Sequence, residues 1–166
     1  MHPGLISIEA QIAAMAARWG GFTVVQCSGR AATWEGWLCP QKTWYHVRIA
    51  YRVPLAPESF RVIAVQPRVQ ILDPVLELHP SYEEGPLPHV YINRQNPALP
   101  YLCLFDPYNH EWTPTDLIAD TTVPWTARHL YFYEGWLLTH KWKGGGRHAS
   151  WEERRGDGQG KILATV

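Results

Sequence analysis

The chain has 166 residues, of which 46% are hydrophobic and only 18% charged, a composition that fits one folded domain with a sizeable core. Fifteen basic and fifteen acidic residues give a formal net charge of zero, which argues against the basic footprint that nucleic-acid and membrane-surface binders need. No apolar run is long enough to cross a bilayer and no signal peptide precedes the first predicted helix, so we expect a soluble, cytoplasmic protein.

The three cysteines, Cys27, Cys39 and Cys103, are an odd number and have no metal-like spacing. In a cytoplasmic protein such thiols stay reduced. We therefore expect neither a metal site nor a cofactor.

The chain begins with an amphipathic pattern. Apolar residues recur at spacings of three and four, which predicts a helix over residues 5–19 that ends at Gly20-Gly21. Four strands are then predicted, at Phe22–Cys27, Thr33–Cys39, Tyr45–Val53 and Arg61–Val65. Their short links favour an antiparallel meander with the helix on one face, which is an α+β fold.

The stretch from Pro67 to Pro107 contains eight prolines and loses regular periodicity. Proline removes a backbone donor, so it interrupts both central strands and helix interiors. Apolar residues nevertheless occur throughout this stretch. We therefore predict an ordered but mostly irregular segment that packs on the body of the domain.

Helical patterns return near the end of the chain. Thr113 and Pro114 are suited to begin a short helix through about Asp120, and a longer helix is predicted from near Pro124. Gly144-Gly145-Gly146 should end the folded part. We expect a domain over residues 1–143 and a flexible, glycine-rich, charged tail over residues 144–166.

Cys103 is the candidate nucleophile, because it lies in the irregular segment between Pro100 and Pro107. A lone cysteine among apolar residues is more often simply buried. Transfer of an acyl group from a thioester to an amine needs a thiolate, a donor for the oxyanion and a base. Polar residues that could supply these functions lie nearby in the sequence: His89, Asn93, Asn96, Asn109 and His110.

A reactive thiol must be approachable. We therefore expect Cys103 to be partly solvent-accessible, and Cys27 and Cys39 to be protected within their strands. The aromatic and proline-rich stretch around the cysteine is the candidate partner-binding surface, since aromatic residues beside a polar rim make good anchors. This surface consists of Tyr101, Phe105, Pro107 and Tyr108.

The order of these elements resembles the ubiquitin-conjugating (E2) family over roughly residues 5–140. Leu102-Cys103-Leu104 is similar to the family's catalytic cysteine context, and Trp112-Thr113-Pro114 is similar to its Trp-Ser-Pro segment. The resemblance implies a ubiquitin-conjugating-enzyme-like fold with an N-terminal helix, a four-stranded meander, an irregular catalytic segment and C-terminal helices. It also implies that Cys103 forms a thioester and passes the acyl group to a lysine.

One departure concerns the family's His-Pro-Asn tripeptide, which this chain lacks. Pro88-His89 lies fourteen residues before Cys103, and Asn93 and Asn96 lie nearer the expected place in another context. His89 is our first choice to replace the family asparagine, because divergent bacterial E2-like proteins use a histidine there.

Segments near the end of the chain, such as Tyr133-Glu134-Gly135-Trp136 and Trp142-Lys143-Gly144, look like the compact bacterial E2-like proteins of antiphage cyclic-oligonucleotide signalling operons. That resemblance implies a cGAS-like nucleotidyltransferase as the partner, with its C-terminus as the acyl group.

Two other functions are compatible with the sequence. The chain could be a catalytically inactive E2-like binding module. The absence of the His-Pro-Asn tripeptide favours this alternative. It could also be a thiol hydrolase that uses Cys103 with His89 or His110.

Overall fold

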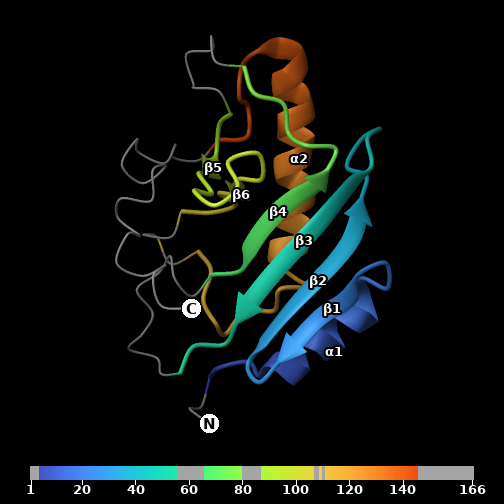
Figure 1. Ribbon diagram of the computed structural model, residues 1–166, viewed down its shortest axis with the longest axis vertical. Coiled ribbons are helices and arrows are strands. Elements are labelled where there is room, and N and C mark those ends of the chain that lie inside the picture. The colour runs from blue at the N-terminus through green and yellow to red at the C-terminus, as the bar shows by residue number, and fades with distance from the viewer. Residues whose placement is uncertain (1–3, 56–65, 80–86, 107–108, 110, 146–166) are drawn as a thin grey trace.

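The computed structural model describes residues 4–55, 66–79, 87–106, 109 and 111–145. Within these residues, two helices and six strands follow one another (Figure 1). Their order is α1 (Ile8–Arg18), β1 (Thr23–Ser28), β2 (Ala31–Leu38), β3 (Tyr45–Arg52), β4 (Arg68–Asp73), β5 (Val90–Tyr91), β6 (Tyr101–Leu102) and α2 (Thr122–Thr139). The predicted α+β class, with an N-terminal helix and a four-stranded antiparallel meander, is confirmed.

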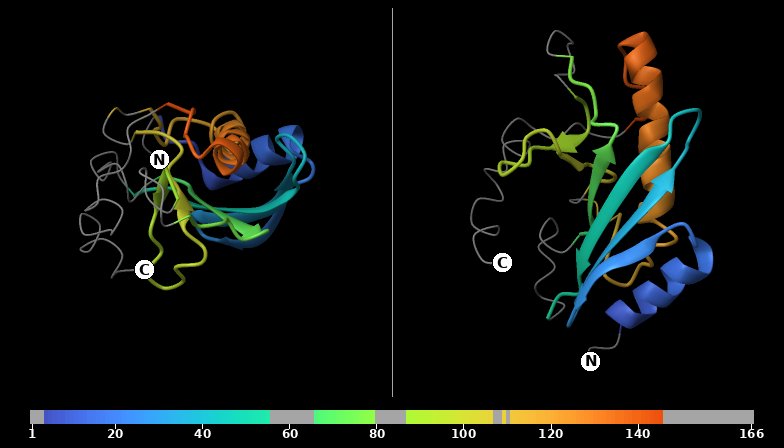
Figure 2. Two further views of the ribbon diagram at one scale, coloured as in Figure 1. Left: turned by 90° about the horizontal axis from the view of Figure 1, so that it is seen from above. Right: turned by 45° about the vertical axis from the view of Figure 1, so that its right-hand side comes forward.

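The main sheet has the order β1-β2-β3-β4, with every neighbouring pair antiparallel. Side chains alternate between its faces, and the buried face places Trp34 opposite Ile49, which in turn lies opposite Val69. Both helices cover this one side of the curved sheet (Figure 2). The core therefore lies between the inner face of the sheet and α2.

Helix α1 is fixed to the segment that precedes α2. Ser7 caps the helix by accepting a hydrogen bond from the Ala10 N–H. Gln11 is fully buried, and its amide nitrogen donates to Asp116 O at 2.8 Å while its amide oxygen accepts from the Ile118 N–H at 2.9 Å. Both polar ends of this buried side chain are thus satisfied.

Helix α2 ends in a reversal of the chain. His140 adopts a left-handed conformation with φ 60°, and its N–H donates to Trp136 O at 2.8 Å. The following residues return along α2, so that the Trp142 ring lies 6.1 Å from that of Phe132. A Cβ on Gly144 would lie 2.7 Å from Trp142 Nε1 and 2.8 Å from Phe132 Cδ2, so this approach requires glycine.

The position predicted for the fourth strand was wrong. The strand that pairs with β3 is Arg68–Asp73, inside the stretch expected to be irregular, and Val69 and Ile71 alternate inward as a half-buried strand requires. Pro67 and Pro74 border this strand rather than interrupt it. Residues 61–65, where the fourth strand was predicted, lie outside the described residues.

The short helix predicted from Thr113 to Asp120 was also wrong, because this segment forms turns. The Asp116 carboxylate accepts from the Thr113 N–H at 2.7 Å, and the Asp116 N–H donates to Thr113 O at 2.9 Å. These reciprocal bonds close a tight turn instead of starting a helix. Helix α2 begins after this turn, at Thr122.

Most of the predicted tail, residues 146–166, lies outside the described residues, so the domain boundary at residue 143 stays a prediction. Of the two described helices, neither combines the length and hydropathy needed to cross a membrane.

Replacing Gln11 by leucine should lower the free energy of unfolding by roughly 1–3 kcal/mol, because the buried Ile118 N–H and Asp116 carbonyl lose their partner. Urea denaturation measures this change. The matched control is Gln41→Leu, whose amide bonds Tyr131 O at an exposed site, so its stability should stay within about 0.5 kcal/mol of the parent. Equal effects of both substitutions would contradict the anchoring role of Gln11.

Candidate active site

Cys103 is positioned by the short hairpin of β5 and β6. Val90 pairs with Leu102 and Tyr91 with Tyr101, so continuing the register by one residue places His89 opposite Cys103. The Cys103 N–H donates to His89 O at 2.9 Å, which closes the hairpin at this end. His89 has φ 52°, a left-handed conformation that turns the chain where the strand begins. The fold thus brings together the predicted nucleophile and its first-choice histidine.

The loop of this hairpin is tied to the main sheet through Leu99. The Leu99 carbonyl accepts from Gln70 Nε2 on β4 at 2.8 Å and from Asn93 Nδ2 at 3.2 Å. Asn93 is buried, and its Oδ1 accepts from the backbone N–H groups of Gln95 and Asn96 at 3.1 and 3.3 Å. These are local turn bonds of the kind asparagine forms in loops.

The two candidate asparagines therefore shape the hairpin loop. Asn96 is exposed, its carbonyl accepts from the Leu99 N–H at 3.0 Å, and neither Asn93 nor Asn96 lines the cavity beside Cys103. His110, the remaining candidate, lies outside the described residues.

The sulfur of Cys103 contacts two oxygen atoms of different character. It lies 3.2 Å from the Tyr91 hydroxyl oxygen and 3.6 Å from the Phe105 carbonyl oxygen. Either oxygen can accept the thiol proton. The hydroxyl can also act as a donor, whereas the carbonyl can only accept.

The predicted exposure of the cysteines was wrong. Cys103 is 9% exposed, whereas Cys27 and Cys39 are exposed. Cys27 belongs to edge strand β1, whose residues are exposed throughout, and Cys39 follows the end of β2. Strand membership does not protect a side chain at the edge of a sheet, so an alkylating reagent has a shorter path to Cys27 and Cys39 than to Cys103.

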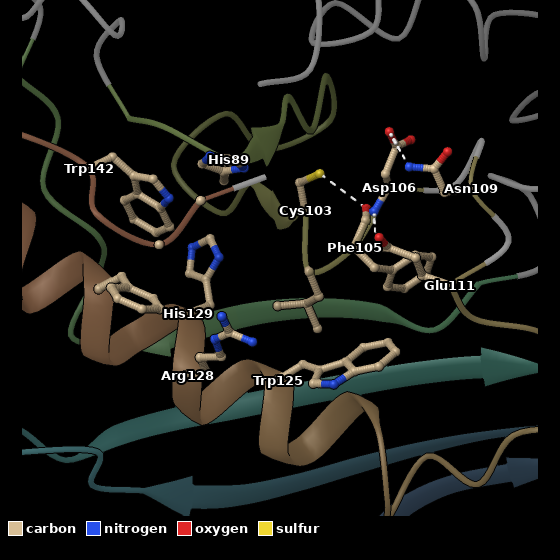
Figure 3. A pocket seen from close by; sticks show the side chains of 14 residues that line it. His89, Cys103, Phe105, Asp106, Asn109, Glu111, Trp125, Arg128, His129 and Trp142 are labelled. Atoms are coloured by element: carbon tan, nitrogen blue, oxygen red, sulfur yellow. Dashed lines mark hydrogen bonds between the residues drawn. The ribbon is translucent and has the colours of Figure 1, made fainter. Parts of the chain in front are cut away.

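Cys103 nevertheless lies in the wall of a cavity of about 480 Å³ (Figure 3). One side of the cavity comes from the segment Cys103–Asp106, and another from the face of α2 that carries Arg128 and His129. Trp142 and the two glycines after Lys143 complete it. Asp106, Glu111 and Arg128 supply charged groups, and the Asp106 N–H donates to Glu111 Oε2 at 2.8 Å.

Two histidines and a tryptophan gather at one end of the cavity, while the Cys103 sulfur points toward Phe105 (Figure 3). The ring of Trp142 stacks on that of His89 at 4.9 Å with an interplanar angle of 30°, and it lies 5.0 Å from the ring of His129. His89 and His129 are both buried. His129 Nε2 has no hydrogen-bond partner among the described residues.

Burial, and to a lesser extent the nearby His89, together lower the pKa of His129 to about 3. The His129 imidazole is therefore neutral at physiological pH. A neutral ring in this wall can donate or accept a hydrogen bond, but a group with so low a pKa is a weak base.

The two described members of the predicted partner surface are half-buried. Phe105 packs 5.5 Å from the ring of Trp125 and lines the cavity, and the guanidinium of Arg68 lies 5.9 Å from the ring of Tyr101. Pro107 and Tyr108 lie outside the described residues.

Sequence reasoning missed Tyr91, His129 and the position of Trp142. A tyrosine in a two-residue strand carries no pattern that points to a distant cysteine. His129 lies on the apolar stripe of α2. A histidine among apolar residues at helical spacing was the one sequence feature that could have indicated a residue of the site. Within the described parts of the chain, no three His, Cys, Asp or Glu residues are close enough to hold a metal ion.

Comparison with known protein families gives a match that covers most of the chain. The family model described as type II CBASS E2 protein matches residues 11–149, a span that contains the main sheet, the β5–β6 hairpin and α2. A search of curated proteins found no match.

The pKa of His129 predicts a specific dependence of stability on pH. Because the pKa is lowered from 6.5 to about 3 in the folded state, the unfolded chain binds the proton first, and stability falls as the pH drops below about 6.5. At pH 5 this residue should cost about 2 kcal/mol relative to pH 7.5. Urea denaturation at both values should show the loss in the parent protein and a smaller loss in His129→Phe. An identical loss in both proteins would show that His129 is not the source of this pH dependence.

Proposed function

The chain belongs to the family of type II CBASS E2 proteins, and from this premise we propose that Cys103 carries an acyl group as a thioester and transfers it to an amine. The observation that carries the proposal is the position of the Cys103 sulfur in the wall of a cavity of about 480 Å³. The family match places the chain in antiphage CBASS defence, where E2-like proteins work beside other CBASS components.

The proposed chemistry has two steps. The Cys103 thiolate attacks the carbonyl carbon of a thioester held by another thiol, so that a new S–C bond forms and the donor thiolate leaves. A neutral lysine amine then attacks the Cys103 thioester. The tetrahedral intermediate collapses, the C–S bond breaks, the Cys103 thiolate leaves and the amine proton passes to a base.

We assign His89 the role of hydrogen-bond donor to the oxyanion of this intermediate. Support comes from its place opposite Cys103 in the hairpin and from the cavity wall that both residues share. The stack on Trp142 holds the imidazole in a fixed orientation, as a preorganised donor requires. Asn93 and Asn96 contribute indirectly, by shaping the loop between β5 and β6.

The acyl group in this proposal is the C-terminus of a cGAS-like nucleotidyltransferase, and the acceptor is a lysine in the cytoplasm. Membership of a CBASS family supports this partner. The partner would approach over the predicted surface of Tyr101, Phe105, Pro107 and Tyr108, of which Phe105 lines the cavity.

A catalytically inactive binding module is the second candidate. The 9% exposure of Cys103 favours it, because acylation requires a large donor to reach the sulfur. A Cys/His hydrolase would release its acyl group to water, so it would not accumulate the thioester that the first proposal requires.

Replacing Cys103 by alanine should abolish the covalent adduct. Coexpression with the operon partners, followed by a non-reducing gel, should show a band that thiol reagents remove in the parent protein. Cys27→Ala serves as the matched control and should keep this band, because Cys27 lies exposed on β1, outside the cavity wall. A thiol-sensitive band that persists in Cys103→Ala would refute the assignment, and its absence from the parent would favour a binding module or a hydrolase.

Replacing His89 by glycine should slow amine transfer on the order of 10²–10³-fold while the thioester still forms, since one oxyanion donor is lost. Glycine accepts the left-handed backbone of this position, so the hairpin geometry is kept. His89→Asn restores an N–H donor and tolerates the same backbone, so it should recover part of the rate. Discharge of the preformed thioester to a lysine amine measures both variants. Unchanged transfer in His89→Gly would show that another residue holds the oxyanion.

A further inference from the structure

We infer that the Tyr91 hydroxyl is a catalytic hydrogen-bond donor to the Cys103 sulfur, which stabilises the thiolate when it attacks and again when it leaves. The inference rests on the proposed function of Cys103 and names a residue that acts directly on its reacting atom. The Tyr91 hydroxyl oxygen lies 3.2 Å from Cys103 Sγ, within hydrogen-bond distance for sulfur.

The geometry of the hairpin fixes this contact. Tyr91 pairs with Tyr101, so Cys103 lies two residues further along the partner strand and diagonally across from Tyr91. Diagonal neighbours of this kind are within reach of aromatic side chains. Tyr91 is 7% exposed and forms a small buried cluster with Cys103, against which Tyr101 packs. The phenol therefore does not need to move to reach the sulfur.

The two sulfur contacts respond in opposite ways when the thiol ionises. A thiolate has no proton to give, so the Phe105 carbonyl oxygen, 3.6 Å away, becomes an acceptor facing an anion. The Tyr91 hydroxyl can rotate its proton toward the sulfur and become a donor. Hydrogen bonds to charged groups are stronger than those between neutral groups, and burial strengthens them further.

Both chemical steps use this donor. In thioester formation it stabilises the attacking thiolate, so that a larger fraction of Cys103 is ionised at neutral pH. In amine transfer the C–S bond breaks and the electron pair returns to sulfur, where the Tyr91 proton stabilises the charge of the leaving thiolate. The proton stays on the Tyr91 oxygen throughout, so no other reagent is needed.

The test compares Tyr91→Phe with the parent by alkylation of Cys103. Cys27→Ser and Cys39→Ser are introduced into both proteins, because these exposed thiols would otherwise consume the reagent. Iodoacetamide labelling is followed by intact mass across a series of pH values. We expect the Cys103 rate near neutral pH to fall on the order of tenfold to a hundredfold, and the two rates to converge as the pH rises.

The matched control is Tyr51→Phe. Tyr51 is a buried tyrosine on β3 whose hydroxyl has no hydrogen-bond partner among the described residues, so the same chemical change should leave the labelling profile unmoved. Circular dichroism verifies the fold. If Tyr91→Phe fails to fold, Tyr91→Leu removes the hydroxyl without adding volume and is measured in the same way.

An unchanged profile in the Tyr91 variant would overturn the inference. A rate reduced by the same factor at every pH would also overturn it, because that result indicates altered access rather than altered ionisation. Alkylation needs no conjugation partner, so the outcome is independent of thioester formation. A shifted profile together with a parent protein that forms no thioester would retain the hydrogen bond and refute the proposed function, and with it the catalytic role of Tyr91.

Discussion

The hydrogen bond from the Cys103 N–H to the His89 carbonyl is the constraint on which the site depends. It closes a hairpin with only two paired residues in each strand, and so short a pairing is not stable by itself in water. Its support comes from the Leu99 carbonyl, which is held by Gln70 of the main sheet and by Asn93 of the loop. The position of the thiol therefore depends on hydrogen bonds made in the loop between β5 and β6.

The opposite wall of the cavity depends on how α2 ends. The left-handed His140 turns the chain back, and this reversal places Trp142 against His89 and His129. The aromatic wall excludes water from His129 and keeps its imidazole neutral. Hydrogen-bond donors in a buried wall interact more strongly with a developing negative charge than donors in water do, which is what acyl transfer requires.

The sequence was sufficient to predict the elements that follow from periodicity: the first helix, the meander through β3 and the long C-terminal helix. It was insufficient where contacts between distant parts of the chain determine the local structure. Pro67 and Pro74 were interpreted as interruptions, although they border β4, and the turn at Thr113 depends on the Asp116 carboxylate. At the site, the proximity of His89 to Cys103 was anticipated from the resemblance to bacterial E2-like proteins and not from the spacing of the two residues. The contact with Tyr91 was not, since it arises from a register that sequence spacing does not encode.

The family match accounts for the E2-like arrangement, within which Cys103 is the residue proposed to carry the acyl group. Replacing Cys103 by serine tests this role, because the adduct would then be an oxygen ester instead of a thioester. We expect an adduct on residue 103 that resists thiol reagents and is cleaved by base, identified by peptide mass mapping. An adduct in Cys103→Ser that remains sensitive to thiol reagents, or that maps to Cys27 or Cys39, would contradict it.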